Sequence, residues 1–188
     1  MAKVYEFLAE GFEEVEAMIP VDIMRRGGVE TATVSITGNI CVTSAHGVII
    51  QADMLWEDAD LSDAELLLLP GGMPGATNLN AHDGLLRALA AHDKAGKLIG
   101  AICAAPLVLG GLGLLKGRRA TCYPGFEKYL TGAEYTAELY TDDGNITTGE
   151  GPAATLPYAY ALLAKLTSHE NAVNVAGGMR YLHLMGEE

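Results

Sequence analysis

The sequence predicts an α/β protein whose mainly parallel sheet carries helices on both faces. Short apolar runs alternate with longer segments of helical periodicity along the 188 residues. One run, 65–69, has four consecutive leucines, which is typical of a parallel strand buried on both faces. This strand–helix alternation favours parallel pairing through crossover helices. The length fits a single domain, and we expect it to span residues 1–188.

The elements are read from local patterns. The first half of the chain predicts a strand at 4–8, a helix at 13–26, a strand at 29–36, a hairpin at 40–51 and the strand at 65–69. The second half predicts helices at 85–95, 106–115, 153–166 and 171–176, and strands at 98–102, 120–123 and 146–148. Gly27 and Gly28 end the first helix, and Pro20 predicts a kink or a late start within it.

Composition excludes several classes of protein. With 24 acidic and 12 basic residues, the net charge of −12 argues against nucleic-acid or anionic-membrane partners. The stretch 98–115 is uncharged, but one proline and four glycines interrupt it, so it predicts buried core and not a membrane span. Three scattered cysteines fit neither a disulfide scaffold nor a zinc site. No signal peptide is evident, so a cytoplasmic location is expected.

Three predicted loops end strands at the edge where open parallel sheets bind ligands. They cover residues 10–16, 70–75 and 103–106, and each carries groups able to do chemistry. Because the carboxyl ends of parallel strands share one edge of the sheet, we expect the three loops to converge. Glu6 lies in a strand predicted to be buried, so it needs a partner, and its role stays open.

Cys103 has the setting of a nucleophile at a strand-to-helix turn. Small residues flank it at Ala101, Ala104 and Ala105, as a sharp turn requires. The pattern follows the logic of the nucleophile elbow, with cysteine in place of serine. The following helix would offer free N–H groups, which predicts a lowered thiol pKa. A buried, inert cysteine is the alternative that the residues alone leave open.

Glu16 lies one turn into the first helix, in the run Glu13-Glu14-Val15-Glu16. Glu13 and Glu14 fit a solvated helix start, where acidic groups favour the helix dipole. Glu16 can face the ligand-binding edge, and contact with a thiolate at Cys103 would raise its pKa and keep it a protonated donor to the sulfur. We therefore expect the two groups to titrate as a coupled pair.

Pro70-Gly71-Gly72 ends the strand at 65–69. Its glycine N–H groups can approach a ligand closely and hold an oxyanion, although an ordinary tight turn explains the same residues. A cysteine hydrolase also needs a base, and the chain has five histidines, at 46, 82, 92, 169 and 183. None adjoins Cys103 and only His82 falls near a predicted loop of this edge, so each is expected to be a surface residue.

Four segments together resemble the ThiJ/PfpI superfamily, and more narrowly its branch of Parkinson disease protein 7 and YajL. They read FLAEGFEEVE at 7–16, LPGG at 69–72, AICAAP at 101–106 and GP at 151–152. The resemblance spans nearly the whole chain. It implies a flavodoxin-like fold, similar to class I glutamine amidotransferases, and a homodimer.

The resemblance also implies functional residues. Cys103 would be a nucleophilic, oxidation-sensitive cysteine, and Glu16 its protonated hydrogen-bond partner. Gly71 and Gly72 would form the anion site. Further oxyanion or substrate contacts are expected from Ala104, Tyr123 and Pro152. The implied activities need no cofactor or metal: glyoxalase and deglycase action, an oxidative-stress response and chaperone-like behaviour.

Departures from the family pattern affect the chemistry. Relatives often carry a histidine where this chain has Tyr123, and tyrosine is a poor base at neutral pH. The protease branch has a histidine directly after its cysteine, where this chain has Ala104. Cys122 lies beside Tyr123, either as a resolving thiol or as a core cysteine.

Several functions follow from these residues. The first is action on small reactive carbonyls or their protein or nucleotide adducts, in which Cys103 attacks the carbonyl carbon. The second is an oxidation-sensing stress protein or redox-regulated chaperone. A cysteine peptidase is disfavoured by Ala104, and a flavodoxin-like nucleotide binder lacks a phosphate-binding loop.

Overall fold

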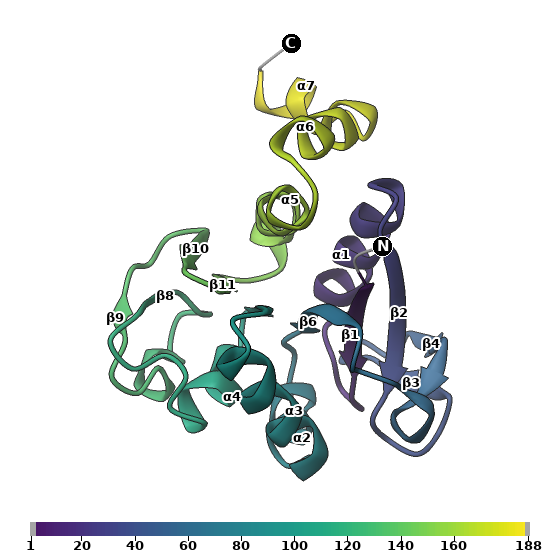
Figure 1. Ribbon diagram of the computed structural model, residues 1–188, viewed down its shortest axis with the longest axis vertical. Coiled ribbons are helices and arrows are strands. Elements are labelled where there is room, and N and C mark those ends of the chain that lie inside the picture. The colour runs from purple at the N-terminus through teal and green to yellow at the C-terminus, as the bar shows by residue number, and fades with distance from the viewer. Residues whose placement is uncertain (1–2, 187–188) are drawn as a thin grey trace.

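A computed structural model describes residues 3–186 and shows a seven-stranded sheet between helical layers (Figure 1). The strand order is β10-β11-β7-β6-β1-β2-β5. In that order the strands are Tyr140–Asp143, Ile146–Gly149, Leu98–Ile102, Ala64–Leu69, Lys3–Leu8, Glu30–Ser35 and Met54–Leu55. All neighbours pair in parallel except β10 and β11. This arrangement is the predicted flavodoxin-like α/β fold.

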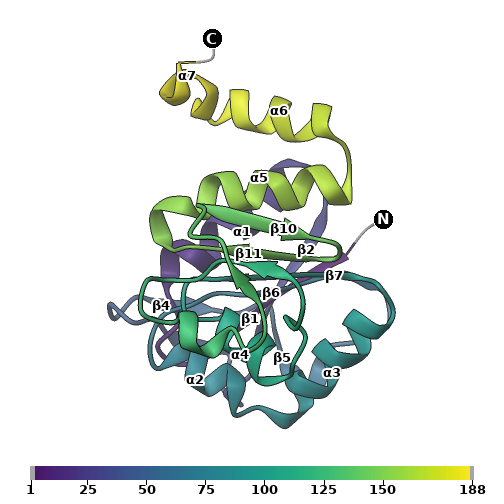
Figure 2. The same ribbon diagram turned by 90° about the vertical axis from the view of Figure 1, so that its left-hand side faces the viewer.

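Helices cover both faces of the sheet (Figures 1 and 2). On one face lie α1 (Glu14–Arg26) and α5 (Thr155–Leu166), and on the other α2 (Gly75–Asn80), α3 (Asp83–Lys94) and α4 (Pro106–Gly111). Outside α5 pack α6 (His169–Gly178) and then α7 (Tyr181–Met185). Short 3₁₀ turns occupy Trp56–Asp58, Glu127–Tyr129 and Pro152–Ala154.

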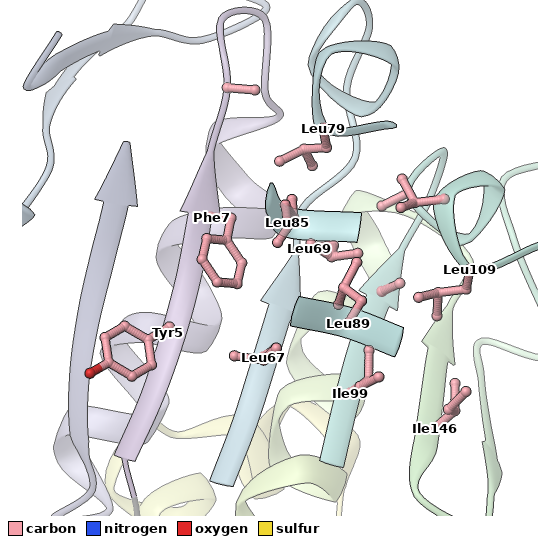
Figure 3. Close-up of a cluster of buried hydrophobic side chains, with 14 of the residues drawn as sticks. Tyr5, Phe7, Leu67, Leu69, Leu79, Leu85, Leu89, Ile99, Leu109 and Ile146 are labelled. Carbon is pink, nitrogen blue, oxygen red and sulfur yellow. The ribbon is translucent and has the colours of Figure 1, made fainter. Parts of the chain in front are cut away.

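Alternation along β1 shows how the sheet is held between these layers. Tyr5 and Phe7 pack with leucines of α2 and α3 on one face (Figure 3). Val4 points to the other face and joins the cluster under α1 and α5. Fully burying one such apolar side chain contributes about 1.5–3 kcal/mol. These two clusters fix the strands whose ends carry the predicted site.

Some predicted elements differ in the structure. The strand expected at 120–123 is only β8 (Arg119–Ala120), which pairs with β9 (Glu134–Tyr135) outside the main sheet. Directly after β8, the N–H of Thr121 donates to the side-chain hydroxyl of Thr148. Helix α4 ends four residues earlier than predicted, before the left-handed Gly113. Helix α1 runs through Pro20 without the predicted late start.

The predicted hairpin is present as β3 (Cys41–Thr43) and β4 (Ile49–Gln51). Helix α2 and strands β5 and β10 were not predicted, because elements of two to six residues leave little periodicity to read. Within the described residues no helix is long and apolar enough to cross a bilayer, and the uncharged stretch 98–115 contains β7 and α4. The outermost residues of the predicted domain 1–188 lie outside the described part.

Candidate active site

The three predicted loops meet at the carboxyl edge of adjacent strands β1, β6 and β7. The N–H of Glu13 donates to the carbonyl of Gly71 at 3.0 Å, and the N–H of Gly75 donates to the carbonyl of Gly11 at 3.1 Å. A Cβ placed on Gly71 would lie 2.7 Å from the Cβ of Cys103. The convergence expected from strand topology is therefore present, and only a glycine fits where the loops touch.

Cys103 is held in a left-handed backbone conformation directly after β7. Its φ is 63°, a region that costs a non-glycine residue about 1–3 kcal/mol. Hydrogen bonds fix both sides of the residue: its N–H donates to the carbonyl of Gly149, and its carbonyl accepts from the N–H of Tyr123, each at 2.9 Å. The nucleophile-elbow geometry predicted from the small neighbours is present.

The Glu16 carboxyl lies beneath the sulfur and is 1% exposed. Its Oε2 accepts a hydrogen bond from the N–H of Gly71 at 2.9 Å, Oε1 has no hydrogen-bond partner among the described residues, and the carboxyl lies close enough to the Cys103 side chain for the two to influence each other's pKa. Burial raises the pKa of Glu16 to about 7, against the opposing effects of the Cys103 side chain and the Gly71 N–H. A substantial fraction of Glu16 is therefore protonated at neutral pH; the pKa is raised as predicted, but burial is the cause, because the Cys103 side chain acts to lower it.

The pKa of the Cys103 thiol differs from the one that the sequence predicted. Burial and the negative charge of Glu16 raise the pKa of Cys103 to about 12, while the backbone N–H groups of Gly72 and Ala104 act to lower it. The lowered pKa predicted from the helix start is therefore not found, because the helix N–H groups are outweighed by burial and by a neighbouring carboxylate. A proton held on Glu16 removes that charge and favours the thiolate, so the two groups titrate together.

The predicted anion site at Gly71 and Gly72 differs in one of its two donors. Gly71 gives its N–H to Glu16, so it positions the carboxyl and is not free to hold an oxyanion. The backbone groups facing the sulfur are those of Gly72 and Ala104. Gly72 can occupy its place because its φ of 82° suits glycine and a Cβ there would lie 2.5 Å from the N–H nitrogen of Glu13. These two donors are the available oxyanion site.

A pocket of about 360 Å³ opens over Cys103, which is 9% exposed. Its lining includes Gly72 and three further predicted residues, Ala104, Tyr123 and Pro152. Glu13, His46, Met73 and Phe126 complete the lining and were not predicted. The volume suits a small molecule or the end of a modified side chain.

His46 is the functional candidate that the sequence did not reveal. It is exposed at the surface, as expected, but it also lines the Cys103 pocket, whereas His82 was the histidine predicted to lie nearest the loops. In the structure His82 instead caps α3, with its Nδ1 accepting from the N–H of Leu85 at 3.0 Å, and it does not line the Cys103 pocket. The parallel bridge between Phe12 and Ser44 brings the hairpin turn to the site. No local motif could have indicated that contact.

The ligand atoms of Glu13, Glu14 and His46 all lie within 4.8 Å of one another. Such a group has the donors to hold a divalent cation. The structure shows the three engaged as an ion-paired cluster, with His46 Nδ1 3.0 Å from Glu14 Oε1 and 3.5 Å from Glu13 Oε2. The sequence predicted that Glu14 lies in solvent at the helix start, whereas in the structure its carboxyl pairs with His46.

Glu6 is a second carboxyl buried near the site. It is 1% exposed, and neither carboxyl oxygen has a hydrogen-bond partner among the described residues. Burial, with a smaller effect of Glu16, raises the pKa of Glu6 well above the usual value and so favours its protonated form. The buried hydroxyl of Tyr158 likewise has no hydrogen-bond partner within residues 3–186, and it occupies the space that a Cβ on Gly100 would need. We expected a partner for Glu6 because it is buried, and residues 3–186 do not provide one.

The three cysteines differ in environment. Cys41 is exposed, whereas Cys122 is fully buried in the core cluster under α4. Burial, followed by the nearby Glu127 and Glu150, raises the pKa of Cys122 to about 12. These surroundings fit the core alternative for Cys122 and not a resolving thiol.

The family model of the DJ-1/PfpI family matches residues 2–165. The chain belongs to this family. Parkinson disease protein 7 homolog of Danio rerio is 34% identical over 172 residues, which cover 89% of this chain and 91% of that protein. A deglycase of Pyrococcus abyssi is 29% identical and covers 77% of this chain and 87% of the relative.

Protein DJ-1 homolog B of Arabidopsis thaliana is 37% identical over 90% of this chain, but the match covers only 39% of that protein. The chain thus spans well under half the length of this curated relative. Among solved structures, a DJ-1 superfamily protein of Salmonella typhimurium has a TM-score of 0.91 and 34% identity, covering 95% of this chain and 98% of its own. Oxidised DJ-1 of Toxoplasma gondii has the same TM-score at 32% identity and the same coverages.

Proposed function

We propose that this protein acts on small reactive carbonyl compounds, or on their adducts, through Cys103 and without a cofactor. The supporting observation is the thiol held at the elbow beside a partly protonated carboxyl, with two backbone donors at the sulfur. The similarity to a deglycase of Pyrococcus abyssi supports the same class of reaction. The pocket volume of about 360 Å³ suits a dicarbonyl of a few atoms.

The first step would be addition of the Cys103 thiolate to an aldehyde. A sulfur–carbon bond forms while the carbonyl π pair moves to oxygen, which gives a hemithioacetal after protonation. The N–H groups of Gly72 and Ala104 would stabilise the developing oxyanion. The pKa of Glu16 is about 7, so part of it is ionised near neutral pH, and this ionised form would accept the thiol proton as the sulfur becomes nucleophilic.

The test is lactate formation from methylglyoxal, which needs only the addition of water. We expect activity in the wild type and a fall to the uncatalysed background in Cys103→Ser. The matched control, Cys41→Ser, changes an exposed cysteine that does not line the pocket, and it should retain wild-type activity. Equal rates in the wild type and Cys103→Ser would reject the proposal.

A second candidate is a redox-regulated stress protein. The donors of Gly72 and Ala104, which would hold an oxyanion, can also receive the oxygens of an oxidised sulfur. Mild peroxide followed by mass spectrometry tests this, and oxidation confined to Cys103 would support it. The exposed Cys41 is the internal comparison, because modification that begins there contradicts a tuned sensor.

The homodimer and the cytoplasmic location stay predictions from the sequence. We propose the homodimer on the resemblance to the family, and light scattering after size-exclusion chromatography tests it. A monomer mass at micromolar concentration would contradict the proposal.

A further inference from the structure

The pocket over Cys103 contains a histidine that the sequence alone did not place there. His46 lies in the turn between β3 and β4 and lines the pocket with Cys103, Tyr123 and Glu13. No other histidine of residues 3–186 lines it. The site therefore has an imidazole although Tyr123 and Ala104 stand where family members carry their histidines.

Backbone hydrogen bonds fix this turn against the loop before α1. The N–H of Gly11 donates to the carbonyl of Thr43 at 2.8 Å, and the N–H of Ala45 donates to the carbonyl of Phe12 at 2.7 Å. Within the turn, the N–H of Val48 donates to the Ser44 hydroxyl at 3.0 Å. The backbone of His46 therefore lies in a turn that these hydrogen bonds hold in place, although the His46 side chain is 66% exposed.

Glu14 sets the orientation and tautomer of the ring. His46 Nδ1 lies 3.0 and 3.1 Å from the two Glu14 carboxyl oxygens. Because an ionised carboxylate only accepts, Nδ1 carries a hydrogen and Nε2 is the atom that gains and loses the titrating proton. The Glu14 hydrogen bond and the charges of Glu14 and Glu13 raise the pKa of His46, and this favours imidazolium near neutral pH.

We propose that His46 is the general acid for addition of Cys103 to a carbonyl, with Glu14 as its positioning residue. The inference rests on the proposed function and identifies where the hemithioacetal receives its proton. As the sulfur–carbon bond forms, the carbonyl π pair moves to oxygen and the Nε2 proton transfers to that oxygen. This leaves neutral imidazole, which regains a proton from water. Gly72 and Ala104 stabilise the same oxygen before the transfer.

The test compares two reactions of the same thiol in the wild type, His46→Gln and Glu14→Gln. Addition to methylglyoxal requires a proton donor, whereas alkylation of Cys103 by iodoacetamide releases iodide and requires none. We expect His46→Gln to lower kcat/KM for lactate formation about 100-fold, the lower range for general acid catalysis, and to leave alkylation unchanged. The matched control is His169→Gln, an exposed histidine at the start of α6 that does not line the pocket.

The pH profile separates the roles of the two residues. The ionisable groups around His46 are Glu13, Cys103 and Tyr123 in the pocket wall, Glu14 paired with Nδ1 outside that lining, and Glu16 beside the Cys103 thiol. Because imidazolium is the acid, wild-type kcat/KM should fall as pH rises through the pKa of His46. Glu14→Gln should move that fall to lower pH, and His46→Gln should abolish it. A His46→Gln enzyme within threefold of the wild type, or one that loses alkylation in parallel, overturns the proposal.

The rate of hemithioacetal formation, followed by stopped-flow absorbance, separates this proposal from the proposed function. If the wild type adds methylglyoxal but forms no lactate, the proposed function fails. The role of His46 can still be tested, because the rate of addition can be compared between the wild type and His46→Gln. A slower addition in His46→Gln supports the role of His46, and an unchanged rate refutes it. If Cys103 adds no carbonyl at all, both proposals fall.

Discussion

Glu16 accepts a hydrogen bond from the backbone N–H of Gly71 at 2.9 Å while the same carboxyl contacts the Cys103 side chain. This contact joins α1, the loop after β6 and the elbow after β7 into one site. It fixes a buried carboxyl that would otherwise be free to rotate away from the sulfur. The protonation of the pair follows from this arrangement, because neither group can lose its proton without affecting the other.

Replacing Glu16 by Gln should lower the thiol pKa of Cys103. The negative carboxylate is the largest effect after burial that raises this pKa, and glutamine has no charge. The rate of iodoacetamide alkylation as a function of pH measures the change, with Glu57→Gln, an exposed residue remote from the pocket lining, as the matched control. Superimposable profiles for the wild type and Glu16→Gln would remove Glu16 from the site.

Gly71→Ala should disrupt the site even though it adds a single methyl group. Its Cβ would lie 2.7 Å from both the Cys103 Cβ and Glu16 Oε2, and 2.9 Å from the backbone nitrogen of Ala104. Overpacking of this kind costs about 1–3 kcal/mol. We expect lower stability in urea and lower activity with methylglyoxal. The same change at Gly178, where a Cβ meets nothing within 4 Å, should leave both unaffected, and equal behaviour of the two variants would contradict the argument.

Glu6 should make the protein less stable as pH rises. Its folded-state pKa is raised above the ordinary value of 4.5, so its favourable contribution is complete below that pH and is lost as pH climbs through the folded pKa. Across that window the free energy of unfolding should fall by up to about 1.4 kcal/mol per pH unit from this group. Urea unfolding at several pH values should give a flatter profile for Glu6→Gln.

Glu16 also titrates in this range, so Glu16→Gln serves as the reference for the Glu6 experiment. Its pKa of about 7 confines its own contribution to the interval between about 4.5 and 7. A fall in the free energy of unfolding with rising pH that remains in Glu16→Gln and disappears in the double variant identifies Glu6. Parallel stability curves for the wild type and Glu6→Gln would show that Glu6 is not protonated in the folded state.

The three cysteines should react in an order set by exposure and chemistry. Cys122 is fully buried, whereas Cys103 opens onto a pocket, so Cys122 should resist both iodoacetamide and peroxide in the folded protein. Cys41 is exposed and should alkylate readily. Peptide mass spectrometry over a time course reads all three sites at once. Rapid modification of Cys122 in folded protein would contradict the burial that the structure shows.

Removal of metal ions should leave the carbonyl activity unchanged. The proposed chemistry uses a thiol, a carboxyl, an imidazole and backbone N–H groups, and no step needs a cation. Dialysis against EDTA followed by the lactate assay tests this expectation. An activity lost on dialysis and restored by zinc would instead assign a cation to Glu13, Glu14 and His46, whose ligand atoms lie within 4.8 Å of one another.

The sequence by itself determined the fold class and indicated Cys103 as the candidate reactive residue. Strand–helix alternation is visible residue by residue, and the order of parallel strands places their loops along one edge. Cys103 could be recognised because the small residues that a sharp turn needs are its immediate neighbours. Glu16 needed the family resemblance as well, since an acidic residue near a helix start has an ordinary explanation.

Tertiary structure alone decided the finer chemistry of the site. Whether Gly71 donates to a ligand or to Glu16 depends on a contact between residues 55 positions apart in the chain. His46 reaches the pocket because the β3–β4 turn is bonded to the loop before α1, which no local pattern encodes. The pKa of Cys103 follows from burial and from a neighbouring charge, both set by distant segments. Local sequence fixes turns and periodicity, whereas proton affinities depend on which groups the completed fold brings together.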